Sequence, residues 1–294
     1  MKTAAWKAEP SSLLGFRNQR PTGKRVLHIV KGIVMSLVLT GYLIPFFLVI
    51  VNAFKTTPEF LANPVSWPAN FNIDNFRHSF EKMRYLYAFF NTLIITAGSV
   101  ILIPLFSAMT AHFFVRNNWR INRFIFLLMI AAMIIPFQAI MIPLVKIYGS
   151  LGMLNSKWAL IYMYIGFGSS LAVFIYHGFI KSIPLELEES AMIDGCSKLQ
   201  IFFKIVFPLL KSTTITIVIL DLLWIWNDFL LPSLVLLVPD QRTLQLSTFY
   251  FFGTYTVEYG YLMAGLLMTI IPIIIVYLFL QKHIIKGIME GSIK

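Results

Sequence analysis

The stretch YGYLMAGLLMTIIPIIIVYLFLQ, residues 259–281, contains no Asp, Glu, Lys or Arg in 23 positions. A helix rises about 1.5 Å per residue, so a segment of this length crosses the roughly 30 Å hydrocarbon core of a bilayer. The chain around it offers few charged residues to keep such a segment in water. Residues 259–281 are therefore predicted to form a transmembrane helix.

Five further runs have a comparable length and few or no charges. They are residues 32–54, 85–115, 124–145, 158–180 and 212–238. Pro136 and Pro143 predict kinks in the third of these runs, and Asp221 and Asp228 interrupt the fifth. A membrane barrel would need short alternating segments instead. We predict an all-α polytopic membrane protein with six transmembrane helices.

The composition excludes other classes of protein. Hydrophobic residues make up 58% of the 294 residues and charged residues 13%, whereas soluble domains are about 45–50% apolar and about 25% charged. The formal net charge of +11 would suggest nucleic acid in a soluble protein. Here the basic residues fall between the apolar runs, so membrane topology explains them and no nucleic-acid partner is expected. Cys196 is the single cysteine and cannot form an internal disulfide.

The distribution of Lys and Arg predicts the orientation. If the N-terminus is cytoplasmic, 17 basic residues lie in inside segments and 7 in outside segments, so both termini are predicted to be cytoplasmic. No cleavable signal peptide is expected. The outside segment 55–84 is expected to form a small cap with a short helix near 73–83, and 239–258 a second outside loop. The predicted domains are an N-terminal tail 1–31, a transmembrane domain 32–281 and a C-terminal tail 282–294.

The inside segment 182–211 differs in composition from everything around it, and begins SIPLELEESAMIDGCSKLQIFFKIVFP. Pro184 suits the first turn of a helix, and the glutamates that follow lie near its positive end. Asp194-Gly195 predicts a turn, and a second short helix then runs to Pro208. Such a segment could lie in the lipid interface, but three glutamates in one turn disfavour an anionic leaflet. They favour a protein groove with basic partners.

The spacing in this segment resembles the EAA loop of ATP-binding-cassette (ABC) importer permeases. That pattern is Glu-Ala-Ala, three residues, Gly, nine residues, then Ile, any residue, Leu-Pro. Here Glu189-Ser190-Ala191 is followed at the same spacing by Gly195 and by Ile205-Val206-Phe207-Pro208. Ser190 and Phe207 depart from the pattern, and each keeps a side chain of similar character.

Other stretches resemble the carbohydrate-uptake branch of these permeases, and in particular the shorter, six-helix subunit of the maltose type. They are residues 54–60, 91–93, 134–136, 226–229 and the tail 286–294. The resemblance implies a bacterial plasma-membrane complex. Its partners would be a second permease, two ATPase subunits and an extracellular solute-binding protein, and its substrate a carbohydrate, with an oligosaccharide expected.

The chain itself is expected to be a transport subunit without enzymatic activity. It contains no Gly-x-x-x-x-Gly-Lys-Ser/Thr phosphate loop and no Cys/His cluster with metal-ligand spacing. No cofactor is therefore expected in this chain, and the resemblance implies that ATP and Mg²⁺ bind to the partner ATPases.

The resemblance also implies which residues couple transport to ATP hydrolysis. A short helix over 186–194 would ride in a cleft on an ATPase, with Glu189 as the charged contact, Ala191 as the close-packing position and Gly195 as the turn. The C-terminal tail could add a second contact or lie as a basic tail in the interface. The implied coupling residues are Glu188, Glu189, Ala191, Asp194, Gly195 and Pro208.

The fifth run carries candidates for the substrate path. Asp221 lies within an apolar span, where acids are rare and face a cavity or a partner. Carboxylate and amide groups hydrogen-bond sugar hydroxyls, and aromatic rings cover the apolar faces of pyranoses, so Asp221, Trp224 and Asn227 are candidates for lining the path. As alternatives, Asp221 could pair with the second permease, and Trp226-Asn227-Asp228 could be an interfacial anchor.

Three other functions remain open at this point. The chain could be an importer permease for another small solute, such as a polyol or a glycerol phosphate. It could be an ion-coupled secondary transporter, although no internal repeat supports this. It could also be a membrane scaffold, which would leave the 182–211 pattern unexplained.

Overall fold

In the computed structural model, residues 22–253 and 257–292 are described, with side chains for 27–253 and 257–281. Most of the predicted tail 1–31 and the side chains of the predicted tail 282–294 lie outside this description. The chain divides into two compact units, which meet between Leu48 and Val49. Each unit is described by itself.

The first unit consists of helix α1 (Thr22–Asn52) up to Leu48. The helix begins ten residues before the predicted run, and its segment Leu27–Asn52 is long and apolar enough to cross a membrane. Apolar side chains occur on all sides of it, as in a helix surrounded by lipid or by other helices.

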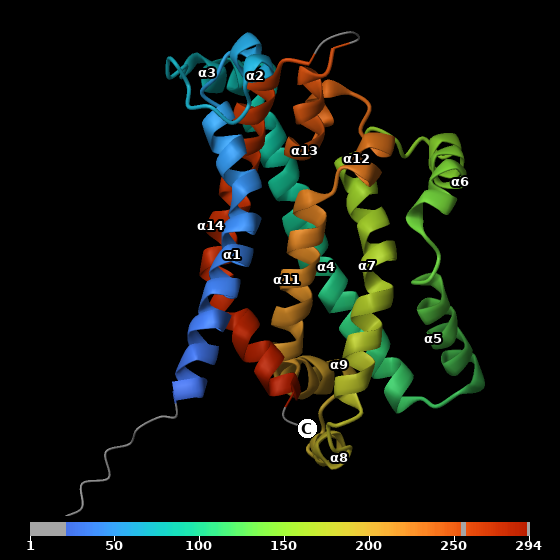
Figure 1. The fold of residues 1–294 in the computed structure, drawn as a ribbon. Helices are drawn as coiled ribbons and strands as arrows, with labels where there is room; N and C mark the ends of the chain where they lie inside the picture. Colours follow the sequence, from blue (N-terminus) through green and yellow to red (C-terminus); the bar gives the residue numbers. More distant parts are fainter. Residues whose placement is uncertain (1–21, 254–256, 293–294) are drawn as a thin grey trace, which may run out of the picture. The chain divides into compact units, whose positions relative to one another are not determined.

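The second unit is built around α4 (Tyr85–Arg116) and α7 (Lys157–Ile180), which pack along their lengths (Figure 1). The buried face of α4 is rich in small residues, including Ser99, Ser107 and Ala108. Small residues let membrane helices approach closely. On α7, a Cβ added at Gly168 would lie 2.8 Å from Cδ1 of Ile103 on α4, so a side chain there would force Ile103 to shift.

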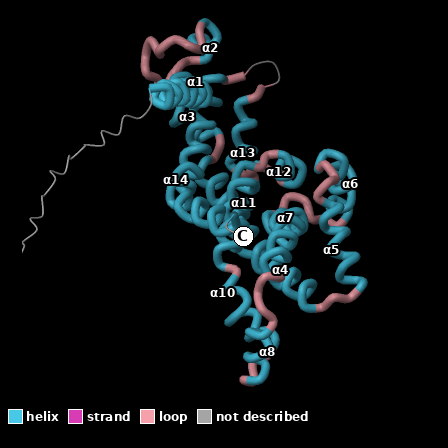
Figure 2. Tube along the Cα trace, turned by 60° about the horizontal axis from the view of Figure 1, so that its bottom comes forward, coloured by secondary structure: helices cyan, strands magenta, loops and turns pink. Residues whose placement is uncertain are grey.

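Two further helices complete the core of this unit. Helix α11 (Lys211–Asn227) contacts α4, α7 and α14 (Tyr259–Ser292), as Figures 1 and 2 show. The hydroxyl of Tyr176 on α7 donates to Oγ1 of Thr214 on α11 at 2.8 Å. The helices predicted over the second, fourth and sixth runs are thereby confirmed as helices.

The third and fifth runs differ from the prediction. The third is a broken pair, α5 (Arg120–Ala132) and α6 (Phe137–Ser150), bent by 108°. Pro136 precedes α6 and breaks the helix rather than kinking it, because proline has no N–H to donate and disfavours a helical backbone at the residue before it. Pro143, in contrast, lies inside α6. The fifth run ends as a helix at Asn227, and the short α12 (Leu230–Val235) follows.

The number of spans follows from these breaks. Among the described residues, four helices are long and apolar enough to cross a membrane, or up to six if each bent pair forms one span. The second bent pair joins Lys198–Leu209 to α11 at 77°. Six spans with both termini on one side therefore stay a prediction.

At the end of the second unit opposite α8 (Glu186–Ile193), short elements form a cap. They are α2 (Thr57–Ala62), α3 (Asp74–Lys82), η2 (Pro239–Gln241), α13 (Leu244–Ser247) and η3 (Thr248–Phe251). Nδ2 of Asn75 donates to the carbonyls of Ala53 and Lys55, both at 2.8 Å. Oγ of Ser79 donates to the carbonyl of Tyr261 at 2.8 Å and ties α3 to α14. The helix predicted near 73–83 is confirmed.

Candidate functional site

The predicted loop segment forms two short helices at one end of the second unit. Helix α8 (Glu186–Ile193) is followed by α9 (Lys198–Ile201), a π-helical turn η1 (Phe202–Val206) and α10 (Phe207–Leu209). Figures 1 and 2 show α8 beyond the ends of the long helices. Its three glutamates lie in the first turn, where the helix dipole favours negative charge.

The turn after α8 has the predicted left-handed residue. Gly195 has φ +82°, a conformation in which a Cβ is disfavoured. The N–H of Cys196 donates to the carbonyl of Ala191 at 2.9 Å and closes the helix end. Ser197 and Gln200 then form a reciprocal capping box at the start of α9. These local hydrogen bonds fix the direction in which the two short helices meet.

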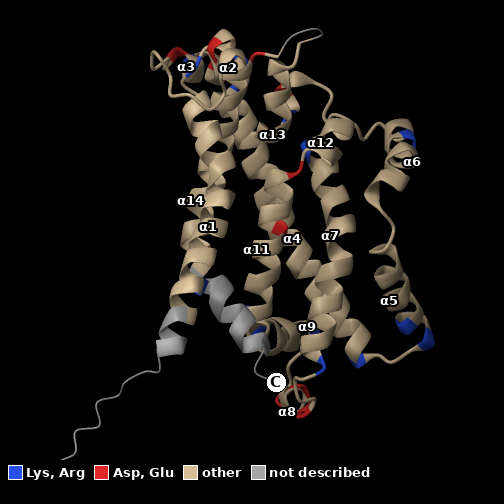
Figure 3. Cartoon of the chain, in the orientation of Figure 1, with Lys and Arg blue, Asp and Glu red and all other residues tan. Residues whose placement is uncertain are grey.

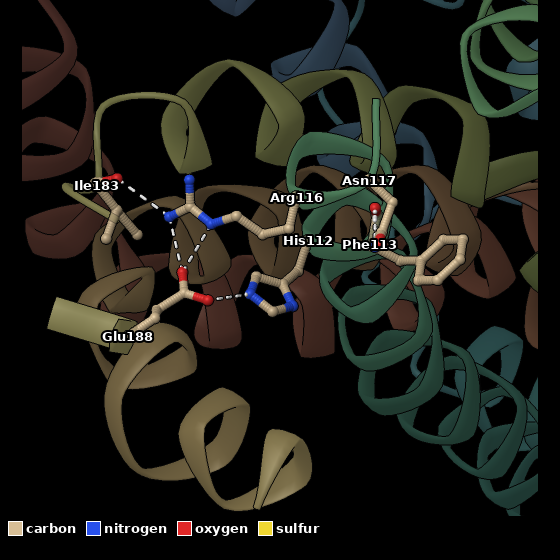
Figure 4. Close-up of polar contacts among 6 residues, drawn as sticks. All are labelled: His112, Phe113, Arg116, Asn117, Ile183 and Glu188. Carbon is tan, nitrogen blue, oxygen red and sulfur yellow. Dashed lines mark hydrogen bonds and ion pairs between the residues drawn. The ribbon is translucent and has the colours of Figure 1, made fainter. Parts of the chain in front are cut away.

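Glu188 attaches α8 to the end of α4 (Figure 4). Its Oε1 accepts from Nε of Arg116 at 2.8 Å and lies 2.7 Å from Nη2, and its Oε2 lies 2.9 Å from Nε2 of His112. Arg116 also donates to the carbonyl of Ile183 at 3.0 Å. Glu188 is only 5% exposed. We call the three side chains of Glu188, Arg116 and His112 the α8 latch.

The opposite face of α8 is open. Glu189 is exposed and forms no ion pair with any described residue. Ile193 is 86% exposed, and Leu187 and Met192 are about half exposed. Figure 3 shows that α8 is the acidic end of an otherwise basic side of the unit. An acidic and apolar face on a short, fixed helix has the chemistry of a protein-docking surface.

The structure thus divides the predicted coupling residues into two groups. Glu188 and Ala191 are buried against the chain's own helices. Glu189, Asp194 and Gly195 are exposed. Pro208 lies in α10, just before the 77° bend into α11.

A cavity of about 350 Å³ opens where the third run breaks, which is a volume typical of small-molecule sites. Gln138, Trp224 and Asp228 contribute polar or aromatic groups to its wall. Asp228 is held from outside the cavity, because Oδ2 accepts from the hydroxyl of Tyr164 at 2.8 Å. Trp224 packs edge-on against Tyr164, with ring centroids 5.5 Å apart.

A second cavity of about 450 Å³ adjoins the first along the same break. The two share Ala132, Met133, Ile135 and Phe167 in their walls. The second cavity adds the rings of Tyr148 and Tyr162 and the hydroxyls of α7. Together they present aromatic rings with a few polar groups.

Of the predicted path residues, only Trp224 lines these cavities. Asp221 is 6% exposed on the buried face of α11, and its Oδ2 has no hydrogen-bond partner among the described residues. Asn227 is exposed, and its Nδ2 donates to the carbonyl of Leu223 at 2.8 Å. Neither lines the cavities described above.

The sequence did not predict four residues that the structure places in the cavity wall or in the α8 latch. Asp228 was visible in Trp226-Asn227-Asp228, but the stretch reads equally well as an interfacial anchor. Gln138 was hidden because a straight third helix gives no reason to expect a cavity. His112 and Arg116 are one helical turn apart at the end of an apolar run, and the segment 182–211 at the same end of the helices is acidic. This pairing of basic spacing with an acidic loop could have predicted an ion pair between them. No group of three or more metal-ligating side chains occurs in the described part of the chain.

Comparisons with known proteins show which family the chain resembles. The model described as "Binding-protein-dependent transport system inner membrane component" matches residues 101–290, which include the α8 latch and both cavities. The chain is 43% identical over 276 residues to "Probable starch degradation products transport system permease protein AmyC" of Thermoanaerobacterium thermosulfurigenes, covering 92% of this chain and 99% of that protein. It is 34% identical to the melibiose/raffinose/stachyose import permease protein MelC of Bacillus subtilis (strain 168), covering 95% and 100%.

A solved structure shows the same fold. A chain of a bacterial ABC transporter involved in the import of the acidic polysaccharide alginate superposes with a TM-score of 0.76 at 22% identity. The match covers 90% of this chain and 98% of that chain. The predicted fold class, an all-α membrane protein of the importer-permease type, is confirmed.

Proposed function

The chain belongs to the family of binding-protein-dependent transport system inner membrane components, and we propose from this that it is a permease subunit of an ABC importer for oligosaccharides. As a family member it is a multi-pass protein of the bacterial plasma membrane and a transport subunit. The ATP hydrolysis that drives uptake would take place in partner ATPase subunits. The α8 end would then face the cytoplasm.

The observation that carries this proposal is the two-sided geometry of α8. One side is fixed to α4 by buried charges, and the other presents Glu189 and Ile193 to solvent. A helix that only lay in the lipid interface would have no use for a buried ion pair to its own bundle. A helix that must transmit displacement from an ATPase needs both a firm attachment and a free docking face.

The substrate class is supported by two independent lines. The relatives named above transport starch degradation products and raffinose-type sugars according to their names. In this chain, Trp224, Asp228 and Gln138 supply a flat ring, a carboxylate and an amide to one cavity. Aromatic rings cover the apolar face of a pyranose, while carboxylate and amide groups bind its hydroxyls.

The proposal includes a complex with three kinds of partner. A second permease subunit would complete the path, and an extracellular binding protein would deliver the sugar. One ATPase would bind the exposed face of α8, and a second ATPase would bind the corresponding helix of the second permease. One solved relative was crystallised with an alginate-pentasaccharide-bound periplasmic protein. The cap formed by α2, α3 and α13 lies at the end of the unit opposite α8, where such a protein would dock.

The test is reconstitution of the assembled complex into vesicles. Uptake of a labelled malto- or raffinose-type oligosaccharide should require both ATP and the binding protein, and should not respond to an imposed proton or sodium gradient. Glu189→Lys should abolish uptake and release the ATPases, while Arg77→Glu, a charge reversal at the opposite end, should leave the ATPases bound. Uptake driven by an ion gradient without ATP would overturn the proposal.

The cavity has its own test. Trp224→Ala and Asp228→Asn should each lower sugar-stimulated ATP hydrolysis per assembled complex by about tenfold, because each removes a sugar contact worth about 1–2 kcal/mol. Trp158→Ala removes the same ring from an exposed position that lines neither cavity and should have no effect. Equal stimulation in all three variants would show that recognition lies in the partner subunits.

A further inference from the structure

A third cavity, of about 420 Å³, lies at the α8 end of the second unit, and none of its lining residues belongs to the α8 latch or to the two cavities described above. Its wall is formed by the end of α4, the first turns of α5 and the end of α7. Nothing in the proposed transport path uses it. The lining residues are Phe114, Val115, Asn117, Asn118, Asn122, Arg123, Phe126, Leu127, His177 and Lys181.

The cavity is cationic. Arg123 and Lys181 both line it and are exposed, and neither forms an ion pair with any described residue. No Asp or Glu belongs to the lining. Glu186, the acidic residue closest along the chain to Lys181, is exposed and forms no ion pair with any described residue, and Glu188 already accepts from Arg116 and His112. Figure 3 shows the basic residues gathered at this end of α5. The charges of Arg123 and Lys181 are therefore available to an anion from outside the chain.

Hydrogen-bond donors add to this charge. Helix α5 begins at Arg120 without a side-chain cap, and its first-turn residues Asn122 and Arg123 line the cavity, so the donors and the positive dipole end of the helix start lie there. Asn122 is 4% exposed, and its Nδ2 donates to the carbonyl of Asn117 at 2.7 Å. This bond ties the first turn of α5 to the end of α4 in the cavity wall.

The rest of the cavity is apolar. Phe126 stacks on His177 with ring centroids 4.0 Å apart and 24° between the rings, and Phe114 and Leu127 extend this surface. A free phosphate would use only the cationic side of such a cavity. An amphipathic ligand would use both sides, with its charged group at Arg123 and Lys181 and its hydrocarbon along Phe126 and Leu127.

We propose that this cavity binds the phosphate headgroup of an anionic phospholipid. Arg123 and Lys181 pair with the phosphate, the start of α5 donates hydrogen bonds to it, and one acyl chain lies along Phe126 and Leu127. The position of the cavity at the α8 end of the protein agrees with this proposal, because basic pockets between transmembrane helices on the cytoplasmic side bind lipid headgroups. This inference does not depend on which solute is transported, although it places the α8 end in the cytoplasm.

The test measures lipid binding to the assembled complex in detergent. Native mass spectrometry titrations with phosphatidylglycerol and phosphatidylcholine of identical acyl chains give the two affinities, and a photoactivatable phosphatidylglycerol locates the site. Phosphatidylglycerol should bind at least fivefold more tightly and label peptides within 114–127 or 177–181. Each basic group near the surface contributes about fivefold, so Arg123→Gln should weaken binding about fivefold and Arg123→Gln with Lys181→Gln about 25-fold.

Two controls use the same helix. Arg120→Gln removes an equal charge one turn from Arg123, at a residue outside the lining, and should leave binding unchanged. Arg123→Lys should retain it within about twofold, because the charge remains.

Four outcomes would overturn the proposal. They are equal affinity for the two lipids, no loss in the double variant, full displacement of the lipid by millimolar inorganic phosphate, and binding to the isolated chain that disappears when the ATPases assemble. The third would identify a free-phosphate site, and the fourth would show that an ATPase occupies the cavity.

Discussion

Glu188→Gln is the substitution that tests most directly how α8 is attached. Glutamine has nearly the same shape as glutamate and keeps one oxygen acceptor, so packing around α8 should survive. The negative charge is lost, and Arg116 is left as an unpaired cation on a side chain that is only 17% exposed. His112 loses its charged partner at the same time.

The magnitude follows from the burial of the pair. The side chain of Glu188 is 7% exposed and makes contacts of 2.7, 2.8 and 2.9 Å to two basic side chains. Removing one member of a buried ion pair typically costs about 3–5 kcal/mol. Because a neutral acceptor remains, we take about 3 kcal/mol, which corresponds to about a 100-fold change in the equilibrium between attached and detached α8.

Hydrogen exchange in the assembled complex measures this equilibrium. Amides of 186–201 should exchange about 100-fold faster in Glu188→Gln, and uptake should fall while ATP hydrolysis continues. Glu186→Gln makes the same chemical change on an exposed side of α8 and should leave exchange unchanged. Arg116→Gln should behave like Glu188→Gln, and the double variant should be little worse than either, because both remove one interaction.

The reasoning would be refuted by one of two results. Exchange over 186–201 could stay at the parental rate in Glu188→Gln, or it could rise equally in Glu186→Gln. Either would show that the backbone turns at Ile183 and Gly195, rather than the buried charges, hold α8 in place.

Three other substitutions have expected outcomes. Gly195→Val should abolish uptake in a protein that still reaches the membrane, because a β-branched residue at φ +82° is strained by about 1–2 kcal/mol, whereas Gly195→Asn should retain it. Gly168→Val should lower the melting temperature of the complex, since its Cβ would lie 2.8 Å from Ile103, and Gly178→Val on the same helix, with open space around it, should not. Asp221→Asn should transport at the parental rate per complex, because Asp221 lines neither of the two cavities at the break between α5 and α6.

The sequence was sufficient to predict the helices and the loop because both depend on local patterns. An uninterrupted apolar run must be helical in a membrane, since every backbone group needs an internal hydrogen bond there. Pro184, the glutamates after it and Gly195 likewise act within their own helix turn. The third run shows the limit, because a proline can kink or break a helix and only the packing of α5 and α6 decides which.

The residues of the site were harder to predict because they meet across the fold. Glu188 and Glu189 are neighbours with the same side chain, and the family pattern suggested Glu189 as the contact. Which of them faces inward depends on how α8 is rotated about its own axis where it packs on α4. A sequence pattern does not specify this rotation. Asp228 and Gln138 lie 90 residues apart in the chain, and share a cavity only because α5 and α6 separate.

The contacts suggest how displacement of α8 would reach the sugar cavity in the proposed importer. Glu188 ties α8 to α4, and α4 is packed along α7 through an interface in which Gly168 closely approaches the side chain of Ile103. A movement of α8 would therefore carry α4 and α7 together. Tyr164 belongs to α7, and its hydroxyl holds the carboxylate of Asp228 at the end of α11. Helix α11 is separated from α8 along the chain by the π-helical turn and the 77° bend, so α11 would not have to follow the movement of α8. A movement of α7 relative to α11 would then act at the Tyr164–Asp228 contact and change the wall of the cavity.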